Sequence, residues 1–243
     1  MTFLDSHVHL YGEFDLDVLF SSFMASARRA APGADAYAMA VMLRSFQPSL
    51  RYALHASPVR DWKLEESAAG TFTASRGDDR ITILPARQVA AAERIEALGL
   101  FGEAMVPDGL PLAETIMRLR EASFTPVLAW GLGKWLFSRS RTVNSVLDAA
   151  IASGDTLLIG DSALRPVFWP EPCQYRVAMA HGIRVLHGSD PLPRPGQERR
   201  AGSYGSVIEA DLDADAPAES LMSAILDASK TIRPVGGRCL LPV

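Results

Sequence analysis

The sequence lacks several patterns that would place it in common classes of protein. It contains two cysteines, Cys173 and Cys239, and neither belongs to a Cys-x-x-Cys pair, which argues against a disulfide framework. No apolar run approaches the roughly 20 residues needed to cross a bilayer, so we expect no membrane partner. The net charge is −4 and no long basic run exists. From this balance we expect no nucleic-acid partner.

Sequence signatures of other enzyme classes are also missing. No Gly-x-Gly-x-x-Gly follows a predicted strand, so a Rossmann dinucleotide site is not expected. There is no Gly-x-Ser-x-Gly nucleophile elbow. Near the start stands Asp5, where a signal peptide would have a basic region and an apolar block, and we therefore expect a cytoplasmic protein.

What the chain does contain is the composition of a globular domain. It has 243 residues, of which 48% are hydrophobic and 21% are charged. This length and composition fit one α/β domain over residues 1–243. The sequence leaves a homo-oligomer open.

Apolar runs alternate with helical patterns along most of the chain. Such alternation predicts a parallel (β/α) TIM-like barrel of seven or eight strands, with an open doubly wound sheet as the rival. Residues 95–100 fit either a strand or the end of a helix. The expected strands cover 1–8, 37–43, 81–84, 125–130, 156–159 and 183–186, and the expected helices cover 16–29, 111–121, 143–152, 172–180 and 218–229.

The alternation lapses over residues 44–79. This segment is polar, contains turn signals, and includes two stretches, 62–66 and 70–75, that could pair as a hairpin. Long excursions after a strand's carboxyl end are where a barrel places loops over its active site. We therefore expect a covering loop or hairpin insertion at about 44–79.

The clearest chemical pattern is Asp5-Ser6-His7-Val8-His9, at the end of the first predicted strand. Side chains in a strand alternate between faces, so His7 and His9 share one face. Two imidazoles at a strand end can converge on one cation at about 2 Å. The pattern therefore indicates a metal site.

A second pattern, Val185-Leu186-His187-Gly188-Ser189-Asp190-Pro191, lies late in the chain. Together the two patterns resemble the amidohydrolase superfamily, in particular its amidohydrolase-2 branch, whose members are metal-dependent hydrolases on a distorted (β/α) barrel. The resemblance implies hydrolysis of a C–N or C–O bond, of the amide or lactone type, in a small molecule.

The histidine count argues for a single metal ion. Members of that superfamily with two metals add histidines at two middle strand ends, where this chain has Trp130-Gly131 and Gly160-Asp161. We therefore expect one divalent ion, with zinc as the expected metal, held by His7, His9 and Asp190. Asp190 could also accept the proton of a metal-activated water and so be catalytic.

Several other polar residues follow predicted strands and are candidates for binding substrate. Three cations at one barrel mouth would suit an anionic substrate. Alternatively, each cation pairs with Asp161, Glu93 or Glu96 or caps a helix. The candidates are Arg87, Gln88, Lys134, Asp161, Arg165 and His187.

Two other functions fit the same residues. The polymerase-and-histidinol-phosphatase family of phosphoesterases is similar in having an early His-x-His and a late Ser-Asp. Its Ser-Asp is followed within a few residues by histidine, whereas Pro191-Leu192-Pro193 follows here. The second alternative is a non-catalytic barrel that binds a metabolite.

Overall fold

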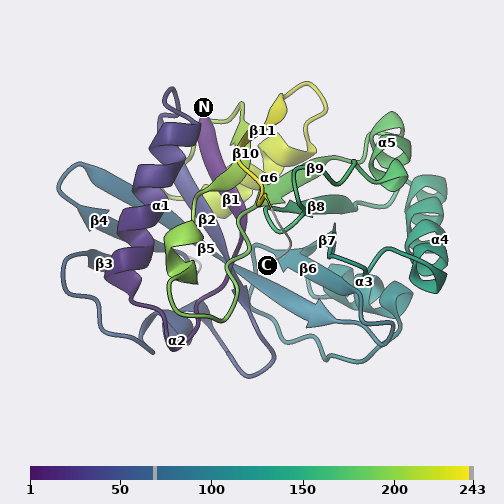
Figure 1. Cartoon of the computed structure of the whole chain (residues 1–243), viewed down its shortest axis with the longest axis horizontal. Helices are drawn as coiled ribbons and strands as arrows, with labels where there is room; N and C mark the ends of the chain where they lie inside the picture. Colours follow the sequence, from purple (N-terminus) through teal and green to yellow (C-terminus); the bar gives the residue numbers. More distant parts are fainter. Residues whose placement is uncertain (68–69, 241–243) are drawn as a thin grey trace.

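The computed structural model describes residues 1–67 and 70–240, and it is built around one strongly curved mixed β-sheet (Figure 1). The order of the main sheet is β11-β10-β1-β2-β5-β6-β7-β8-β9, and β4 and β3 extend it from β5. The last strand, β9, lies against β1 and β10, so the sheet nearly closes into a barrel. Its strands are β1 (Thr2–Val8), β2 (Ala36–Leu43), β3 (Lys63–Glu66), β4 (Phe72–Arg76), β5 (Asp79–Ala90), β6 (Glu96–Leu100), β7 (Thr125–Ala129), β8 (Leu158–Ser162), β9 (Val185–Gly188), β10 (Tyr204–Ile208) and β11 (Ile232–Gly236).

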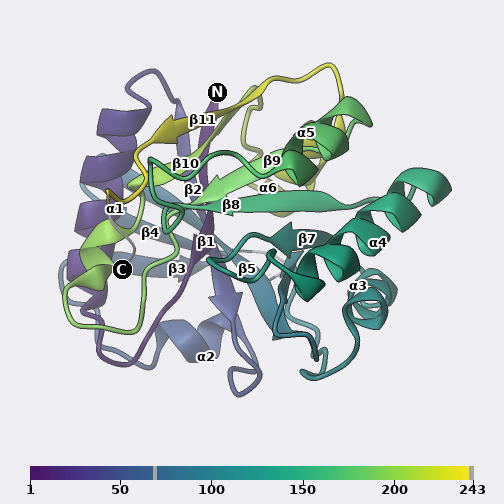
Figure 2. The ribbon, with the colours of Figure 1, turned by 45° about the vertical axis from the view of Figure 1, so that its right-hand side comes forward.

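Helices cover the sheet from two sides. Helix α1 lies against β1, β2 and β5, whereas α3, α4 and α5 lie on the opposite side of the molecule, over β6, β7 and β8 (Figures 1 and 2). Among the described residues, no helix is long and apolar enough to cross a membrane. The helices are α1 (Leu16–Ala30), α2 (Leu50–Leu54), α3 (Leu112–Glu121), α4 (Ser138–Ser153), α5 (Cys173–Ala180) and α6 (Pro217–Leu226), with a 3-10 helix at Gln197–Arg200.

The barrel interior is filled by small and aliphatic side chains. Leu4, Ala38 and Leu186 are among the fully buried residues that face inward. Helix α6 closes the end at which β1 begins, because its Leu221 and Ile225 pack into the same interior cluster. The opposite end, where β1, β2 and β5 finish, is called the mouth below.

The mixed strand directions correct the predicted parallel barrel. Strands β1, β2 and β5 run parallel, as do β7, β8 and β9. However, β6 is antiparallel to both β5 and β7, and β10 is antiparallel to β1. The coarse α/β barrel-like architecture is confirmed, but the sheet is not a uniform (β/α) repeat and has more strands than expected.

Residues 91–95 form a tight turn between β5 and β6, where the sequence also allowed a helix. Residues 90–100 are rich in helix formers, but β5 runs as far as Ala90 and only five residues separate it from β6. The Ala91 amide donates to the Ile95 carbonyl at 2.9 Å, and Arg94 adopts a left-handed φ of 60°. This tight turn leaves no room for a helix, and residues 95–100 therefore form the strand alternative.

The seam between β9 and the start of the sheet is held by serine side chains. Ser6 donates to the His187 carbonyl at 2.9 Å, and the His187 amide donates to Ser206 at 3.1 Å. These two hydroxyls therefore bond the carbonyl and the amide of His187, which form no regular backbone ladder with β1 or β10. The seam matters because it brings β9, and the residues after it, against β1.

The excursion at 44–79 divides into two parts. Residues 63–66 and 72–76 form the hairpin of β3 and β4, and β4 pairs with β5, so the hairpin widens the sheet. Residues 68 and 69 lie outside the described residues. The first part, from Arg44 to α2, follows β2 directly and lies at the mouth. A single domain over residues 1–243 stays a prediction.

Candidate metal centre

Strand β1 delivers two imidazoles to the mouth. His7 lies within β1 and His9 follows its end, and both side chains are buried. Their Nε2 atoms are 3.1 Å apart, and Gln88 Oε1 from β5 lies 3.2 Å from His7 Nε2. The two imidazole rings from the end of β1 therefore meet at the mouth, and Gln88, a predicted substrate-binding residue, contacts one of them from β5.

Asp190 reaches the same point from the loop after β9. Its backbone amide donates to the His7 carbonyl at 2.8 Å, and its φ is 50°, which is uncommon for a residue other than glycine. Asp190 Oδ1 lies 3.6 Å from His7 Nε2 and 3.9 Å from His9 Nε2. Ser162 of β8 donates to Asp190 Oδ2 at 3.0 Å. The other carboxylate oxygen, Oδ1, is thus the one nearest the two rings.

The donor set fits a divalent ion. One ligand atom from each of His7, His9 and Asp190 lies within 4.8 Å of the other two. Separations of this size suit ligands that each lie about 2 Å from one cation. Burial lowers the pKa of His9 to about 3, with the neighbouring His7 as the next cause, so its imidazole is neutral and has a free lone pair at neutral pH. His9 Nδ1 is buried and has no hydrogen-bond partner among the described residues, which leaves Nε2 as the nitrogen with polar neighbours.

Asp5 does not point at the cluster but ties its two halves together. It is fully buried and accepts hydrogen bonds from four donors: the amides of His7, Ser189 and Gly202, and the Ser189 hydroxyl at 2.5 Å. Burial raises the pKa of Asp5 to about 6 despite these bonds. Asp5 therefore positions His7 relative to the loop that carries Asp190.

Gly188 permits the close approach of β9 to β1, and this leads to a test. A Cβ at Gly188 would lie 2.6 Å from the His7 backbone nitrogen. We expect Gly188→Ala to push the two strands apart, to lower the free energy of unfolding by about 1–3 kcal/mol, and to weaken metal binding. Urea unfolding and a metal titration check this. Gly33→Ala is the control, because a Cβ there meets nothing within 4 Å. Wild-type stability and metal affinity in Gly188→Ala would contradict the prediction.

The three cations predicted to face a substrate are all engaged by the protein. Arg87 is 1% exposed and donates to the carbonyls of Arg44, Gln47 and Glu103. Lys134 forms an ion pair with Glu96, the pairing considered as the alternative. Arg165 forms a bidentate pair with Asp161 at 2.8 and 2.6 Å. A role of these cations in binding substrate stays a prediction.

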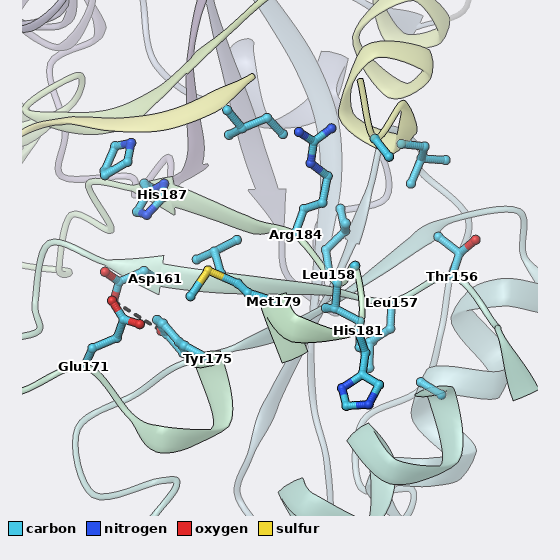
Figure 3. Close-up of a pocket in the computed structure, with 18 of the residues that line it drawn as sticks. Thr156, Leu157, Leu158, Asp161, Glu171, Tyr175, Met179, His181, Arg184 and His187 are labelled. Carbon is cyan, nitrogen blue, oxygen red and sulfur yellow. Dashed lines mark hydrogen bonds between the residues drawn. The ribbon is translucent and has the colours of Figure 1, made fainter. Parts of the chain in front are cut away.

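Asp161, Arg165 and His187 do not join the His7 cluster. Because adjacent strand residues point to opposite faces, Ser162 faces the mouth while Asp161 faces the outside of β8. Asp161, Tyr175 and His187 line a cavity of about 890 Å³ on that outer side (Figure 3). Asp161 therefore lies apart from His7 and Asp190, and the binding of substrate by Asp161, Arg165 and His187 stays a prediction.

Sequence reasoning missed three residues at the mouth. Tyr11 stacks on His9 with ring centroids 5.3 Å apart, and burial raises its pKa to about 12, so its hydroxyl keeps its proton. Ser162 orients Asp190. Arg44 lies directly after β2, and this position at a strand end could have identified it as a residue of the mouth. It was not selected because residues 44–79 have an irregular pattern.

Comparisons with known proteins place the fold. No family model matches, and no curated protein matches. Three similar solved structures are PsfC from Pseudomonas syringae PB-5123 (12% identity, TM-score 0.60), endonuclease Q from Pyrococcus furiosus (15%, 0.55) and a two-domain protein from Bacteroides vulgatus that contains a predicted PHP-like metal-dependent phosphoesterase (12%, 0.51). They align with 96%, 95% and 95% of this chain. The chain spans 91% of PsfC, 57% of endonuclease Q and 64% of the Bacteroides protein.

These similarities correct two expectations. One similar structure is endonuclease Q in complex with a 27-mer duplex, at 15% identity and a TM-score of 0.53. A fold like this one is thus compatible with a nucleic-acid substrate, and the exclusion of nucleic acid from net charge is wrong. The assignment to the amidohydrolase superfamily is also wrong, because the similar solved structures are endonuclease Q and a protein that contains a predicted PHP-like metal-dependent phosphoesterase. In its fold the chain is similar to PHP-like metal-dependent phosphoesterases and endonuclease Q.

Proposed function

We propose that the protein is a metal-dependent phosphoesterase that uses one divalent ion. The observation that carries this proposal is the convergence of His7 Nε2, His9 Nε2 and Asp190 Oδ1 within 4.8 Å at the mouth. Support also comes from the fold, since similar folds occur in PHP-like phosphoesterases. The phosphoesterase alternative therefore replaces the amide or lactone hydrolase.

The chain's own residues have distinct tasks in this proposal. His7, His9 and Asp190 would hold the ion, which when bound lowers the pKa of water toward 7 and polarises a phosphoryl oxygen. Ser162 keeps Asp190 Oδ2 in place, and Tyr11 offers a protonated hydroxyl beside the cluster. Hydrolysis adds the oxygen of water to phosphorus, breaks the ester P–O bond, and delivers a proton to the leaving oxygen. Asp190 is the residue placed to take the proton of water.

Metal content and substrate class test the proposal together. We expect the purified protein to bind one equivalent of a divalent ion such as Zn²⁺ or Mn²⁺ per chain. We also expect it to hydrolyse phosphate esters. This activity should be lost when EDTA removes the ion and should recover when the ion is added back. Amides and lactones serve as control substrates. Two tightly bound equivalents, no bound metal, or faster cleavage of the controls would contradict the proposal.

A further inference from the structure

Arg44 is a cation at the mouth that has no ion-pair partner among the residues that the structure describes. Its side chain forms no hydrogen bond or ion pair with any other residue that the structure describes, in contrast to Arg87, Lys134 and Arg165. The residue is half-buried and follows the last residue of β2. A cation held at a mouth without a counterion favours an anionic ligand.

Aromatic rings hold the guanidinium beside the metal ligands. Arg44 Cζ lies 4.8 Å from the centroid of the Tyr11 ring and 4.4 Å from that of Phe46. Tyr11 stacks in turn on His9. Tyr11 thus links the guanidinium of Arg44 to His9 through two ring contacts.

The turn that carries Arg44 is fixed in advance. The Arg44 amide donates to Gln47 Oε1 at 3.0 Å, and the Gln47 amide donates back to the Arg44 carbonyl at 2.8 Å. Arg87 donates to the same carbonyl, and Gln47 Nε2 donates to the carbonyl of Leu10, next to Tyr11. Arg87, predicted to touch substrate, thus anchors the turn. A preorganised cation loses little freedom when it binds an anion.

Phe46 adds a flat apolar surface to the same turn. Its side chain is 61% exposed, although the Arg44 guanidinium lies over the ring. An exposed aromatic ring beside a free guanidinium suits a ligand that joins a phosphate to an aromatic group, because each part finds its partner. A phosphate with an aliphatic ester group would use only Arg44.

We propose that Arg44 binds a phosphoryl oxygen of the substrate and that Phe46 stacks on an aromatic group carried by the ester group of that phosphate. The substrate class is therefore an aryl or nucleobase-bearing phosphate ester. This inference rests on the proposed function, because it assigns the substrate side of the same metal centre. It assigns Arg44 to binding, while the metal ligands keep their own role.

Inorganic phosphate is the first probe, because its binding needs no turnover. We expect phosphate to bind the Zn²⁺-loaded protein, and Arg44→Ala to weaken that binding at least about tenfold by calorimetry. The metal content of the variant should stay at the wild-type value. Arg76→Ala is the matched control, because Arg76 also lies over an aromatic ring, with Cζ 4.5 Å from the Trp62 centroid. Equal phosphate affinity in wild type and Arg44→Ala overturns the inference.

The aromatic half is tested by comparing two esters. Phe46→Ala should lower kcat/KM for phenyl phosphate about 5- to 100-fold and leave glycerol phosphate nearly unchanged. Equal losses for both esters overturn the role of Phe46. If the wild type binds phosphate through Arg44 but cleaves no ester, the proposed function fails while the anion site stands. If esters are cleaved and Arg44→Ala changes neither phosphate binding nor KM, this inference fails alone.

Discussion

Replacing Asp190 by asparagine is expected to lower the rate of phosphate-ester hydrolysis about 10²–10⁴-fold, the range typical of losing a general base. The variant keeps the oxygen that accepts from Ser162 but loses the charge of the carboxylate. Metal affinity should fall as well, because the anionic ligand of the set is gone. Steady-state kinetics with phenyl phosphate, with and without added Zn²⁺, measures both effects.

The fold should tolerate this change, and that makes the result interpretable. Asp190 has a φ of 50°, and asparagine is among the residues that accept this conformation readily. The thermal midpoint of Asp190→Asn should therefore match the wild type. Ser162→Ala is the graded control, with an expected loss of about 10- to 100-fold, because it removes the hydroxyl that orients Asp190 and leaves the carboxylate itself in place. An unchanged rate in Asp190→Asn would exclude Asp190 from the reaction.

The local pattern of the sequence was sufficient to predict that His7, His9 and Asp190 lie together, and their binding of a metal stays a prediction. Strand alternation places His7 within β1 and His9 just after it, and the late Gly-Ser-Asp places Asp190 after β9. Each of these two positions depends on residues that are neighbours in the sequence, so a single sequence is enough to predict it. What the pattern could not supply is the link through Asp5 to Ser189, which spans 184 positions.

The surroundings of two substrate-binding candidates, Arg87 and Asp161, could not be predicted from the sequence. A strand end is visible in sequence, but the partner of its side chain is not. Arg87 and Asp161 both follow the expected rule for position, yet Arg87 is enclosed by three carbonyls and Asp161 faces the outside of β8. One residue of register decides between mouth and outer face, and the predicted strand bounds were not that accurate.

Strands β10 and β11 were not predicted, because their pairing with other strands determines them more than their own sequence does. Strand β10 is Tyr-Gly-Ser-Val-Ile, which has no clear alternation, and β11 contains Pro234. Proline is accepted in β11 because that strand is at one edge of the sheet. The backbone of β10 is satisfied by β1 and β11 on either side. Their positions therefore depend on the folded barrel more than on their own residues.

The outer side of β8 contains a buried charge pair with unusually complete hydrogen bonding. Arg165 binds both oxygens of Asp161, and the hydroxyls of Tyr175 and Tyr204 donate to the same carboxylate at 3.2 and 2.9 Å. The two charged side chains are 6% and 1% exposed. Through these contacts β8, α5 and β10 meet at one carboxylate.

Asp161→Ala is expected to be the most destabilising single change on this side of the molecule, at about 3–5 kcal/mol in the free energy of unfolding. The change leaves the guanidinium of Arg165 buried without its counterion and removes the acceptor of two tyrosine hydroxyls. Urea unfolding followed by circular dichroism measures the loss. The exposed pair of Arg118 and Glu121 is the matched control, and Glu121→Ala should cost less than about 1 kcal/mol.

A double replacement separates the loss of a buried charge from the loss of packing. Asp161→Leu combined with Arg165→Met removes both charges, so the double variant should be more stable than Asp161→Leu alone. If the penalty comes from lost packing, the second change should instead add to the first. A cost below about 1 kcal/mol for Asp161→Ala would mean that water reaches Arg165 in the variant and replaces the carboxylate. In that case the four side chains do not hold β8, α5 and β10 together.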